Sequence, residues 1–331
     1  MNRRAMLSGA AALALAACGK SSNTASSSGP PKVLNFSILS VENATSVEVV
    51  WKPVLADMEK AIGIPVKPFY ASNYTALVEA MRFKQTDVGW FSNLSGLEAV
   101  RRGGGEVFAR TFDPSGVDGY KSVLIVPASS KTTLDDVLKC DKTLTFGLGD
   151  AKSTSGTLAP KTYLFSPHNI DPEKCFKTVR AANHQANLFS VANGVLDVAT
   201  GNSTSLKIEQ TRSPAIVKKV RVIWESPPLP EDPIIWRKDL DQATKDKVKA
   251  FFINYGKAND ANGERERKLI SQFSIGGFLP ADDSHLLPVR EMEANENYEE
   301  AVRGGNAGKI AETKKTLDEI RAQIAAKKAK A

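Results

Sequence analysis

The sequence contains few of the side chains that bind metals or catalyse hydrolysis. Only three cysteines and three histidines occur among 331 residues, and the histidines, His168, His184 and His285, stand far apart. They do not have the short spacings of zinc sites. The patterns GxSxG, SxxK and HExxH, which mark common hydrolases, are also absent. We therefore expect no metal site, no cofactor and no enzymatic activity.

Clustered positive charge interleaved with aromatic side chains is missing as well. The formal net charge is +7, aromatic residues make up 7% of the chain, and much of the excess Lys and Arg lies in residues 309–331. This distribution is not that of a nucleic-acid-binding surface. A mild positive field instead favours small anions as partners.

Long hydrophobic runs are absent, and the one short run lies at the N-terminus. Met6 to Ala14 are mostly apolar, they follow Arg3 and Arg4, and the small residues that come next end at Cys18. The run is too short to span about 30 Å of hydrocarbon, and this order of parts is typical of a lipoprotein signal. We predict that residues 1–17 are a signal peptide and that Cys18 carries lipid, which gives a membrane-anchored lipoprotein of the periplasm. A plain secretory signal is the alternative, and the paired arginines leave the export route open.

The segment after Cys18 is predicted to be a flexible tether. Residues 19–31 consist mainly of Gly, Ser and Pro and have no apolar side chain large enough to build a core. Residues 18–31 would thus hold the folded body near the membrane. The remaining chain of about 300 residues is long enough for two domains.

The body alternates strand-like runs with amphipathic helices, which predicts an α/β fold with mostly parallel sheets. Strands are expected at Val33–Leu39, Val66–Tyr70, Asp87–Phe91, Glu106–Thr111, Thr143–Gly147, Phe176–Ala181, Leu196–Thr200 and Val220–Glu225. Helices are expected at Val49–Ile62, Tyr74–Phe83, Ser95–Arg102, Leu134–Leu138, Thr154–Phe165 with an interruption at Pro160, His184–Asn193 and Gln242–Tyr255.

Two extended segments, Tyr120–Val126 and Ser226–Pro233, divide this pattern into two lobes. The first lobe is predicted to comprise residues 32–122 plus 231–331, including C-terminal helices, and the second residues 123–230. Two lobes joined by two extended crossings would form a cleft with a hinge.

The two remaining cysteines are expected to form a disulfide. An exported protein folds in an oxidising compartment. Cys140 and Cys175 each precede a predicted strand, and neighbouring parallel strands would bring these entrances together. Two buried, unpaired cysteines are the alternative.

A run of hydroxyl residues, Ser153-Thr154-Ser155, lies where a strand of the second lobe gives way to a helix. Free N–H groups and the positive end of the helix dipole meet there, which favours a phosphate-like anion. An ordinary helix cap would use the same residue types. The run alone therefore leaves both interpretations open.

Several motifs, in order from about residue 33 to about residue 290, give the chain a resemblance to a known family. They are Leu34-Asn35-Phe36, Tyr74, Met81-Arg82-Phe83, Asp87-Val88-Gly89-Trp90, Asn93-Leu94-Ser95, Gly119 to Val126, Ser153 to Gly156, His184, Val198-Ala199-Thr200 and Asp232 to Lys238. In these residues the chain resembles the substrate-binding proteins of phosphonate ABC transporters. The resemblance implies a two-lobed periplasmic-binding-protein fold of type II-like organisation, a phosphonate ligand, and the permease of an ABC importer as partner.

The resemblance also implies a set of ligand-binding residues. In the family a Ser-Thr-Ser run grips the phosphonate oxygens, which here falls on Ser153, Thr154 and Ser155. Further donors would be Tyr74, Tyr120 and His184. Relatives that bind 2-aminoethylphosphonate place two carboxylates near the ammonium; Asp232 matches one, but Thr204 stands where the other is expected. This departure leaves the preferred phosphonate open and predicts a less negative pocket.

Other functions remain to be weighed against this hypothesis. The protein could bind phosphite or phosphate. It could also be a sensor subunit that binds the same ligand but docks on a receptor. An exported hydrolase with Ser153 or Ser155 as nucleophile would need a base and an orienting acid, or a metal. The sequence supplies no motif for either.

Overall fold

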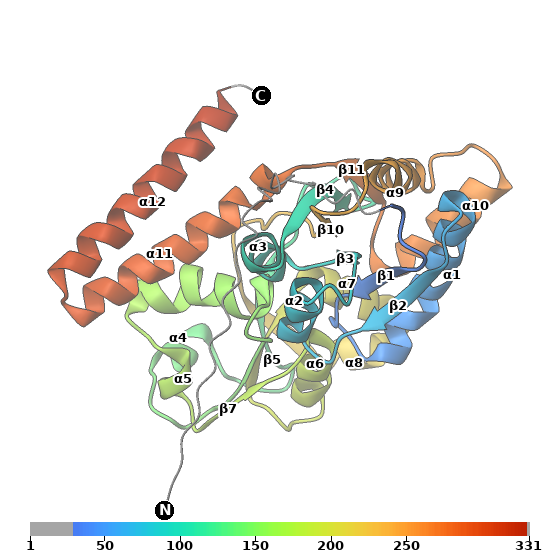
Figure 1. Cartoon of the computed structure of the whole chain (residues 1–331). Coiled ribbons are helices and arrows are strands. Elements are labelled where there is room, and N and C mark those ends of the chain that lie inside the picture. The colour runs from blue at the N-terminus through green and yellow to red at the C-terminus, as the bar shows by residue number, and fades with distance from the viewer. Residues whose placement is uncertain (1–28, 330–331) are drawn as a thin grey trace, which may run out of the picture.

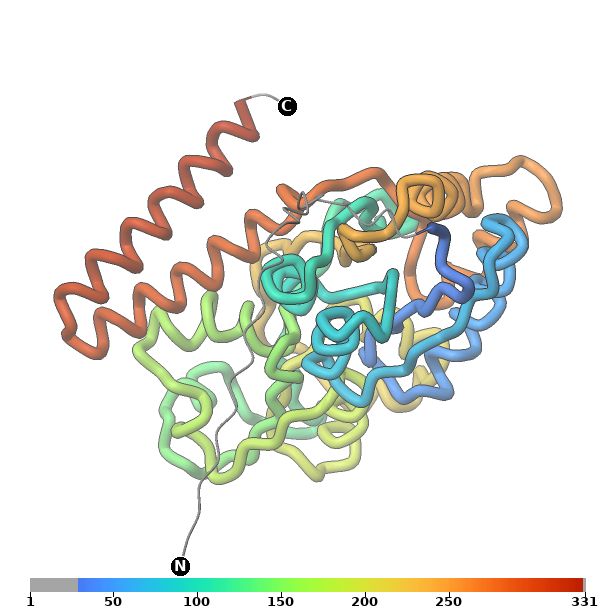
Figure 2. Tube along the Cα trace, in the orientation of Figure 1, coloured from blue at the N-terminus to red at the C-terminus, as the bar shows by residue number. Residues whose placement is uncertain are grey.

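The computed structural model describes residues 29–329, so the predicted signal peptide and Cys18 lie outside the described residues. Two β-sheets with helices packed on them form two lobes, and the polypeptide passes from the first lobe to the second and back (Figure 1, Figure 2). The α/β class predicted from the sequence is confirmed. Among residues 29–329, none of the helices combines the length and the apolar character needed to cross a bilayer.

The first sheet has six strands in the order β11-β4-β10-β3-β1-β2. They are β1 (Leu34–Ile38), β2 (Val66–Tyr70), β3 (Val88–Trp90), β4 (Gly105–Phe112), β10 (Pro233–Arg237) and β11 (Gly277–Pro280). β1 pairs in parallel with β2 and β3, whereas β10 and β11 pair antiparallel to their neighbours. The predicted parallel arrangement thus holds for β1 to β3 only, because β10 enters the sheet on the chain's return from the second lobe.

Amphipathic helices cover this sheet and create the main core. The helices are α1 (Ala44–Ile62), α2 (Tyr74–Arg82), α3 (Asn93–Arg102), α9 (Gln242–Asn254) and α10 (Ala261–Ile270), with the short turns η4 (Ser271–Phe273) and η5 (Asp283–Leu286). Residues of α1 at helical spacing, such as Val47, Val50, Trp51 and Val54, are buried against β1. Trp51 stacks on Phe36 with ring centroids 5.0 Å apart. Burial of each such side chain stabilises the fold by about 1.5 to 3 kcal/mol.

The second sheet has five strands in the order β7-β6-β8-β5-β9. They are β5 (Ser122–Pro127), β6 (Thr145–Leu148), β7 (Thr178–Ala181), β8 (Val198–Asn202) and β9 (Val220–Glu225). Its helices are α4 (Leu134–Leu138), η1 (Thr154–Leu158), η2 (Lys161–Phe165), η3 (Ser166–His168), α5 (Pro172–Cys175), α6 (His184–Ala192), α7 (Ser203–Arg212) and α8 (Pro214–Val217). The helix predicted over Thr154–Phe165 is present as two π-helical turns on either side of Pro160, which has no N–H to continue a regular ladder.

The two lobes repeat the same local design. The strand order β2-β1-β3 returns as β7-β6-β8, with the same parallel pairing. Three helix caps of the first lobe, Asn43, Asn73 and Ser92, each accept a hydrogen bond from the N–H three residues later. Ser153, Asn183 and Asn202 do the same in the second lobe, each at the same distance along the chain from its counterpart. Equivalent helices therefore begin at equivalent sheet edges in both lobes.

The two crossings between the lobes lie side by side. The N–H of Tyr120 donates to Leu229 O at 3.1 Å, and the N–H of Leu229 donates back to Tyr120 O at 2.7 Å. Ser226 N–H also donates to Ser122 O at 2.9 Å. The two extended segments predicted from the sequence thus also pair with each other, as a short antiparallel ribbon between the sheets.

The last two helices, α11 (Leu287–Gly304) and α12 (Ala307–Lys328), form an antiparallel hairpin at one edge of the molecule (Figure 1). Leu317 and Ile320 of α12 are buried against Ala294 of α11. α11 also contacts α3 of the first lobe and η2 of the second. This hairpin therefore touches both lobes, although the sequence analysis assigned it to the first.

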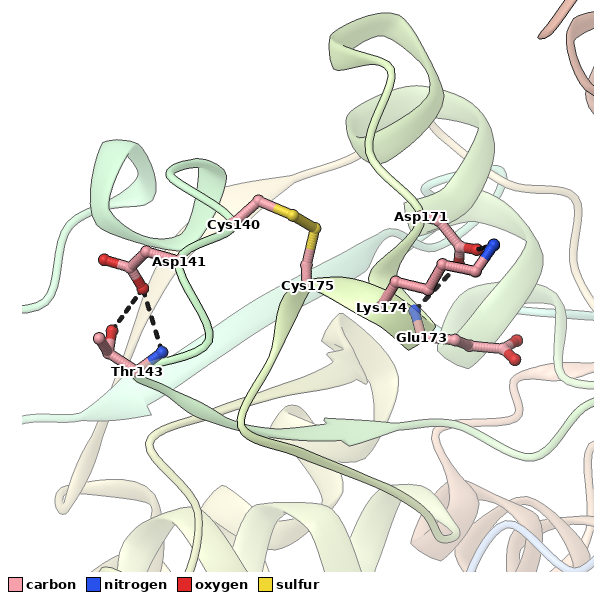
Figure 3. The surroundings of a disulfide bond; sticks show 7 residues. All are labelled: Cys140, Asp141, Thr143, Asp171, Glu173, Lys174 and Cys175. Atoms are coloured by element: carbon pink, nitrogen blue, oxygen red, sulfur yellow. Dashed lines mark hydrogen bonds and ion pairs between the residues drawn. A yellow bond between two sulfur atoms is a disulfide. The ribbon is translucent and has the colours of Figure 1, made fainter.

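Cys140 and Cys175 are joined by a disulfide (Figure 3), with their Cα atoms 4.3 Å apart. Cys140 follows α4, and Cys175 ends α5. These positions precede β6 and β7, which are parallel neighbours. The link ties together the entrances of both strands on the outer part of the second lobe.

Candidate ligand-binding site

A small cavity of about 50 Å³ lies between the two lobes. Elements of both sheets contribute to its wall, which is lined by Leu39, Val41, Tyr74, Trp90, Ser92, Thr111, Tyr120, Ser153, Ser155, His184, Asn202, Thr204, Ser205, Ile208, Glu231, Asp232, Phe273 and Ile275. Every ligand-binding residue predicted from the sequence lines this cavity except Thr154. Residues as far apart in the chain as Leu39 and Ile275 thus gather on it because the lobes face each other.

The cavity wall is built at helix N-termini of both lobes. Tyr74 is the first residue of α2, and His184 is the first residue of its counterpart α6. The caps Ser92 and Asn202 are equivalent in the same way, and both line the cavity. Helix N-termini carry free N–H groups and partial positive charge, so this wall favours an anion.

The Ser153-Thr154-Ser155 turn is held in place by bonds from neighbouring strands. Ser153 Oγ caps η1 by accepting the N–H of Gly156 at 3.0 Å. Ser122 Oγ on β5 donates to Ser155 O at 2.6 Å. A Cβ on Gly149 would lie 2.4 Å from Gly156 Cα, so only glycine permits this close approach. These contacts fix the position of the turn in the second lobe.

Thr154 has a different position from its two neighbours. Its Oγ1 accepts the backbone N–H of Leu94, at the start of α3 in the first lobe, at 2.8 Å. Its side chain joins the lobes and does not line the cavity. The family resemblance placed Thr154 among the ligand donors, because the Ser-Thr-Ser run was carried over as a whole.

His184 faces the serines of the turn. Its Nε2 lies 3.3 Å from Ser155 Oγ and 3.5 Å from Ser153 Oγ. Its Nδ1 is buried and has no hydrogen-bond partner among residues 29–329. Burial lowers the pKa of His184 to about 4, so the ring is neutral at pH 7. A neutral imidazole can donate one hydrogen bond to an oxyanion without adding a full charge.

Two tyrosines add hydroxyls to the wall. Burial, and secondly the nearby Asp232, raise the pKa of Tyr74 and of Tyr120 well above the usual value. Both phenols therefore stay protonated and are able to donate. Together with the serines and His184 they form a set of neutral donors.

The first-lobe wall carries two consecutive acids. Burial, and secondly Glu231, raise the pKa of Asp232 well above its ordinary value, and Asp232 Oδ1 is buried without a hydrogen-bond partner. Burial raises the pKa of Glu231 to about 7. Thr204 also lines the cavity but brings no charge.

Glu231, Ser92 and Asn202 also line the cavity, although they were not predicted from the sequence. The repeat of the helix caps between the lobes is a signal that could have identified Ser92 and Asn202, because both stand at the start of equivalent helices. Glu231 had no such signal, since side chains next to each other in an extended segment normally point to opposite sides.

Direct contacts hold the lobes closed around the cavity. Asn43 Nδ2 donates to Gln185 Oε1 at 2.7 Å, and Arg212 Nη1 lies 2.6 Å from Glu42 Oε2. Ser92 Oγ donates to Lys152 O at 2.9 Å. The structure therefore represents a closed arrangement of the lobes.

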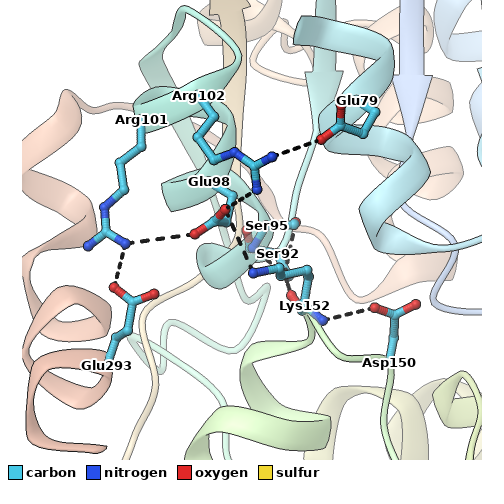
Figure 4. A network of polar contacts seen from close by, with 9 residues as sticks. All are labelled: Glu79, Ser92, Ser95, Glu98, Arg101, Arg102, Asp150, Lys152 and Glu293. Carbon is cyan, nitrogen blue, oxygen red and sulfur yellow. Dashed lines mark hydrogen bonds and ion pairs between the residues drawn. The ribbon is translucent and has the colours of Figure 1, made fainter. Parts of the chain in front are cut away.

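A charged cluster also spans the lobes next to the turn (Figure 4). Glu98 on α3 lies 3.7 Å from Lys152 Nζ of the second lobe and 3.3 Å from Arg102. Arg101 connects the same cluster to Glu293 of α11 at 2.5 Å. Since Lys152 directly precedes Ser153, this cluster fixes the approach to the turn.

Two α/β lobes closed over a small, donor-rich cavity define a bilobal solute-binding protein of the periplasmic type. Residues 36–286 match the family described as "ABC transporter, phosphonate, periplasmic substrate-binding protein". The phosphonates-binding periplasmic protein of Escherichia coli K12 is 42% identical over 262 residues, which cover 79% of this chain and 76% of the relative. The chain therefore belongs to the family of periplasmic substrate-binding proteins of phosphonate ABC transporters. This family is one of substrate-binding components of transporters.

Solved structures agree with this assignment. A binding protein component of an ABC phosphonate transporter from Pseudomonas aeruginosa has a TM-score of 0.85 and 36% identity, and the match covers 89% of this chain and 99% of that one. PhnD1 from Prochlorococcus marinus, in complex with methylphosphonate, has a TM-score of 0.69 and 22% identity, over 79% of this chain and 97% of that one. The first supports the family, and the second shares the fold.

Proposed function

We propose that this protein captures a small phosphonate in the cavity between its lobes and delivers it to the membrane subunits of an ABC importer. The observation that carries the proposal is the neutral donor set of Ser153, Ser155, Tyr74, Tyr120 and His184 around one cavity. Membership of the phosphonate transporter family supports the role in import.

Neutral donors suit a ligand that must be released again. Hydroxyls, backbone N–H groups and an imidazole can satisfy the three oxygens of a phosphonate through hydrogen bonds. Among the residues that the structure describes, no Lys or Arg lines the cavity. Without a buried counter-charge, the specificity of binding depends on the geometry of the hydrogen bonds. Opening of the lobes can then release the ligand to the permease.

The size of the cavity restricts the ligand. A volume of about 50 Å³ has room for only a few water-sized groups, since one water needs roughly 10–15 Å³ by this measure. Methyl-, ethyl- and aminoethylphosphonate fall in this size class, whereas nucleotides do not. The acids on the first-lobe wall support a ligand with a substituent that reaches them.

Phosphite or phosphate is the second candidate. Burial raises the pKa of the Asp232 carboxyl well above its ordinary value, which favours its protonated form. In that form it can donate a hydrogen bond to a fourth oxygen, and in either form it can accept one from a protonated oxyanion. Such a bond would give Asp232 Oδ1 the hydrogen-bond partner that it lacks among residues 29–329, and the ligand would need no organic substituent to form it. Competition between ligands distinguishes the two candidates.

Hydrolysis is the least supported function. Ser155 and His184 are close enough to suggest a nucleophile and its base. However, His184 Nδ1 has no acid to orient it, and the low pKa of the ring makes it a weak base. Within residues 29–329, no three potential metal ligands stand together either.

Export and membrane anchoring form part of the proposal. The N-terminal pattern that ends at Cys18 favours cleavage before this residue and lipid attachment to its thiol. A lipid anchor and the tether over residues 18–31 would keep the body near its permease. Mass spectrometry of the membrane fraction should detect diacylglyceryl-modified Cys18, and Cys18→Ala should release the protein in soluble form; an unmodified N-terminus would contradict the anchor.

The central experiment is calorimetric titration of the soluble body, residues 32–331, with a panel of alkylphosphonates, aminoethylphosphonate, phosphite and phosphate. We expect a phosphonate to bind most tightly. Tighter binding of phosphite or phosphate would favour the second candidate, and no binding of any of these would contradict the proposal. A sensor role would show instead as full ligand affinity without ligand-dependent stimulation of a reconstituted transporter.

A further inference from the structure

Glu231 and Asp232 form an acidic wall at the return crossing, and both line the cavity. Thr111 on β4 holds them there. Its N–H donates to Asp232 O at 2.9 Å, and its Oγ1 lies 3.2 Å from Glu231 Oε2 and 3.3 Å from Asp232 O. A hydroxyl has only one hydrogen, so Thr111 cannot satisfy both oxygens and Glu231 is only weakly fixed.

Within the described part of the chain, neither acid has a Lys or Arg partner. Across residues 29–329, no Lys or Arg nitrogen comes within 4.0 Å of either carboxyl group, and Asp232 Oδ1 has no hydrogen-bond partner. Arg110, which acts on Glu231 from a distance, is itself bound to Asp118 at 2.8 Å. Buried carboxyl groups without a partner destabilise a site unless a ligand supplies the cation.

We propose that Glu231 is a specificity-determining residue which, with Asp232, holds a cationic group of the ligand, so that the neutral Thr204 is compensated from a different position. This inference rests on the proposed function. It changes the expectation drawn from the sequence, where Asp232 stood alone and the pocket was predicted to be less negative. The ligand class is then an aminoalkylphosphonate small enough for the cavity.

The ionisation of Glu231 is consistent with binding a cationic group of the ligand. The groups that face it are Asp232, Arg110, Asp113, Asp118 and Tyr120, and His285 Nε2 contacts its backbone carbonyl at 2.7 Å. Burial raises its pKa to about 7, so without ligand it is partly protonated at neutral pH. An ammonium beside it favours the carboxylate, so binding of the amine should release a proton from Glu231.

The test compares aminoethylphosphonate with ethylphosphonate, which lacks the ammonium, by calorimetry at pH 6.5 in two buffers of different ionisation enthalpy. We expect Glu231→Gln to lower the aminoethylphosphonate preference at least about tenfold, the loss of a bond to a charged group. Affinity for ethylphosphonate should change little, and proton release on binding the amine should fall. Glu231→Asp, which keeps the charge, should retain part of the preference.

Glu225→Gln is the matched control, because Glu225 lies before the same crossing but pairs with Lys121 at the surface. It should leave the preference and the proton release unchanged. An unaltered preference in Glu231→Gln, or an equal loss for both ligands, would overturn the role of Glu231 while leaving phosphonate binding intact. Failure of the wild-type protein to bind either phosphonate would instead overturn the proposed function and this inference with it.

Discussion

The hydroxyl of Thr154 accepts the backbone N–H of Leu94 across the cleft, at 2.8 Å. This bond ties the closure of the lobes to the turn that lines the cavity with Ser153 and Ser155. Residues that line the cavity and a residue that joins the lobes thus alternate within three positions of the chain.

We predict that Thr154→Val weakens binding of every phosphonate by a similar factor, about 3- to 10-fold, because one hydrogen bond of about 0.5 to 1.5 kcal/mol is lost from the closed state only. Thr154→Ser keeps the hydroxyl and should bind as the wild type does. Calorimetry with methyl- and aminoethylphosphonate measures this. A loss confined to one ligand would mean that Thr154 contacts the ligand itself.

Substitutions of Ser155 and Ser153 should have different effects on ligand affinity and on the free energy of unfolding. Ser155→Ala removes a cavity hydroxyl, and we expect at least about tenfold weaker phosphonate binding. Ser153→Ala should reduce affinity and also cost about 1 kcal/mol of stability, because Ser153 caps η1. Denaturant unfolding without ligand measures the second effect. Unchanged affinity in Ser155→Ala would remove the turn from the binding site.

His184 should make the protein less stable in acid. Its pKa in the fold, about 4, lies below that of an unfolded histidine, about 6.5, so between these values the unfolded chain binds a proton that the native state does not. The contribution of His184 is therefore complete above about pH 6.5 and is lost as the pH falls toward 4. Because Glu231 acts in the opposite direction, the difference in unfolding free energy between wild type and His184→Gln is the quantity to measure. A difference independent of pH over this range would contradict a buried, neutral His184.

Arg212 should control closure without touching the ligand. It binds Glu42 at 2.6 Å and Gln272 O at 2.9 Å, and its guanidinium lies 4.9 Å from the centre of the Phe273 ring. Arg212→Met leaves Glu42 buried without a partner in the closed state, so we expect at least about tenfold weaker phosphonate binding. Small-angle scattering should show a larger radius for the ligand-free variant. Arg221→Met, in β9, is the control. Equal radii of gyration for the two ligand-free variants would argue against a role of the Arg212–Glu42 contact in closure.

The disulfide should stabilise the second lobe without affecting ligand selectivity. It closes a step of 35 residues, for which about 2 to 4 kcal/mol is typical. The Cys140→Ser/Cys175→Ser double variant should unfold at lower denaturant concentration and keep the affinity order of its ligands. Two reactive thiols in the unreduced wild-type protein after export would contradict the pairing.

Much of the fold could be predicted because its elements have strong local patterns. The strand at Val66–Tyr70 and the helix at Leu134–Leu138 were predicted with the bounds that the structure has. The helix Ser203–Arg212 was missed, because Leu206 and Ile208 are its only large apolar residues and give no helical stripe. The antiparallel insertion of β10 was also missed, since strand order depends on where the returning chain finds an open place in the sheet.

The sequence by itself determined the two-lobed α/β plan, the pairing of Cys140 with Cys175, and a set of polar residues at helix starts. These follow from periodicity, capping and local spacing, which act over a few residues. Only the tertiary structure decided that Thr154 faces the opposite lobe, that Glu231 joins Asp232 at the cavity, and that Arg212 closes on Glu42. Those relationships depend on how two separately formed lobes meet, and contacts across a cleft leave no local pattern in the chain.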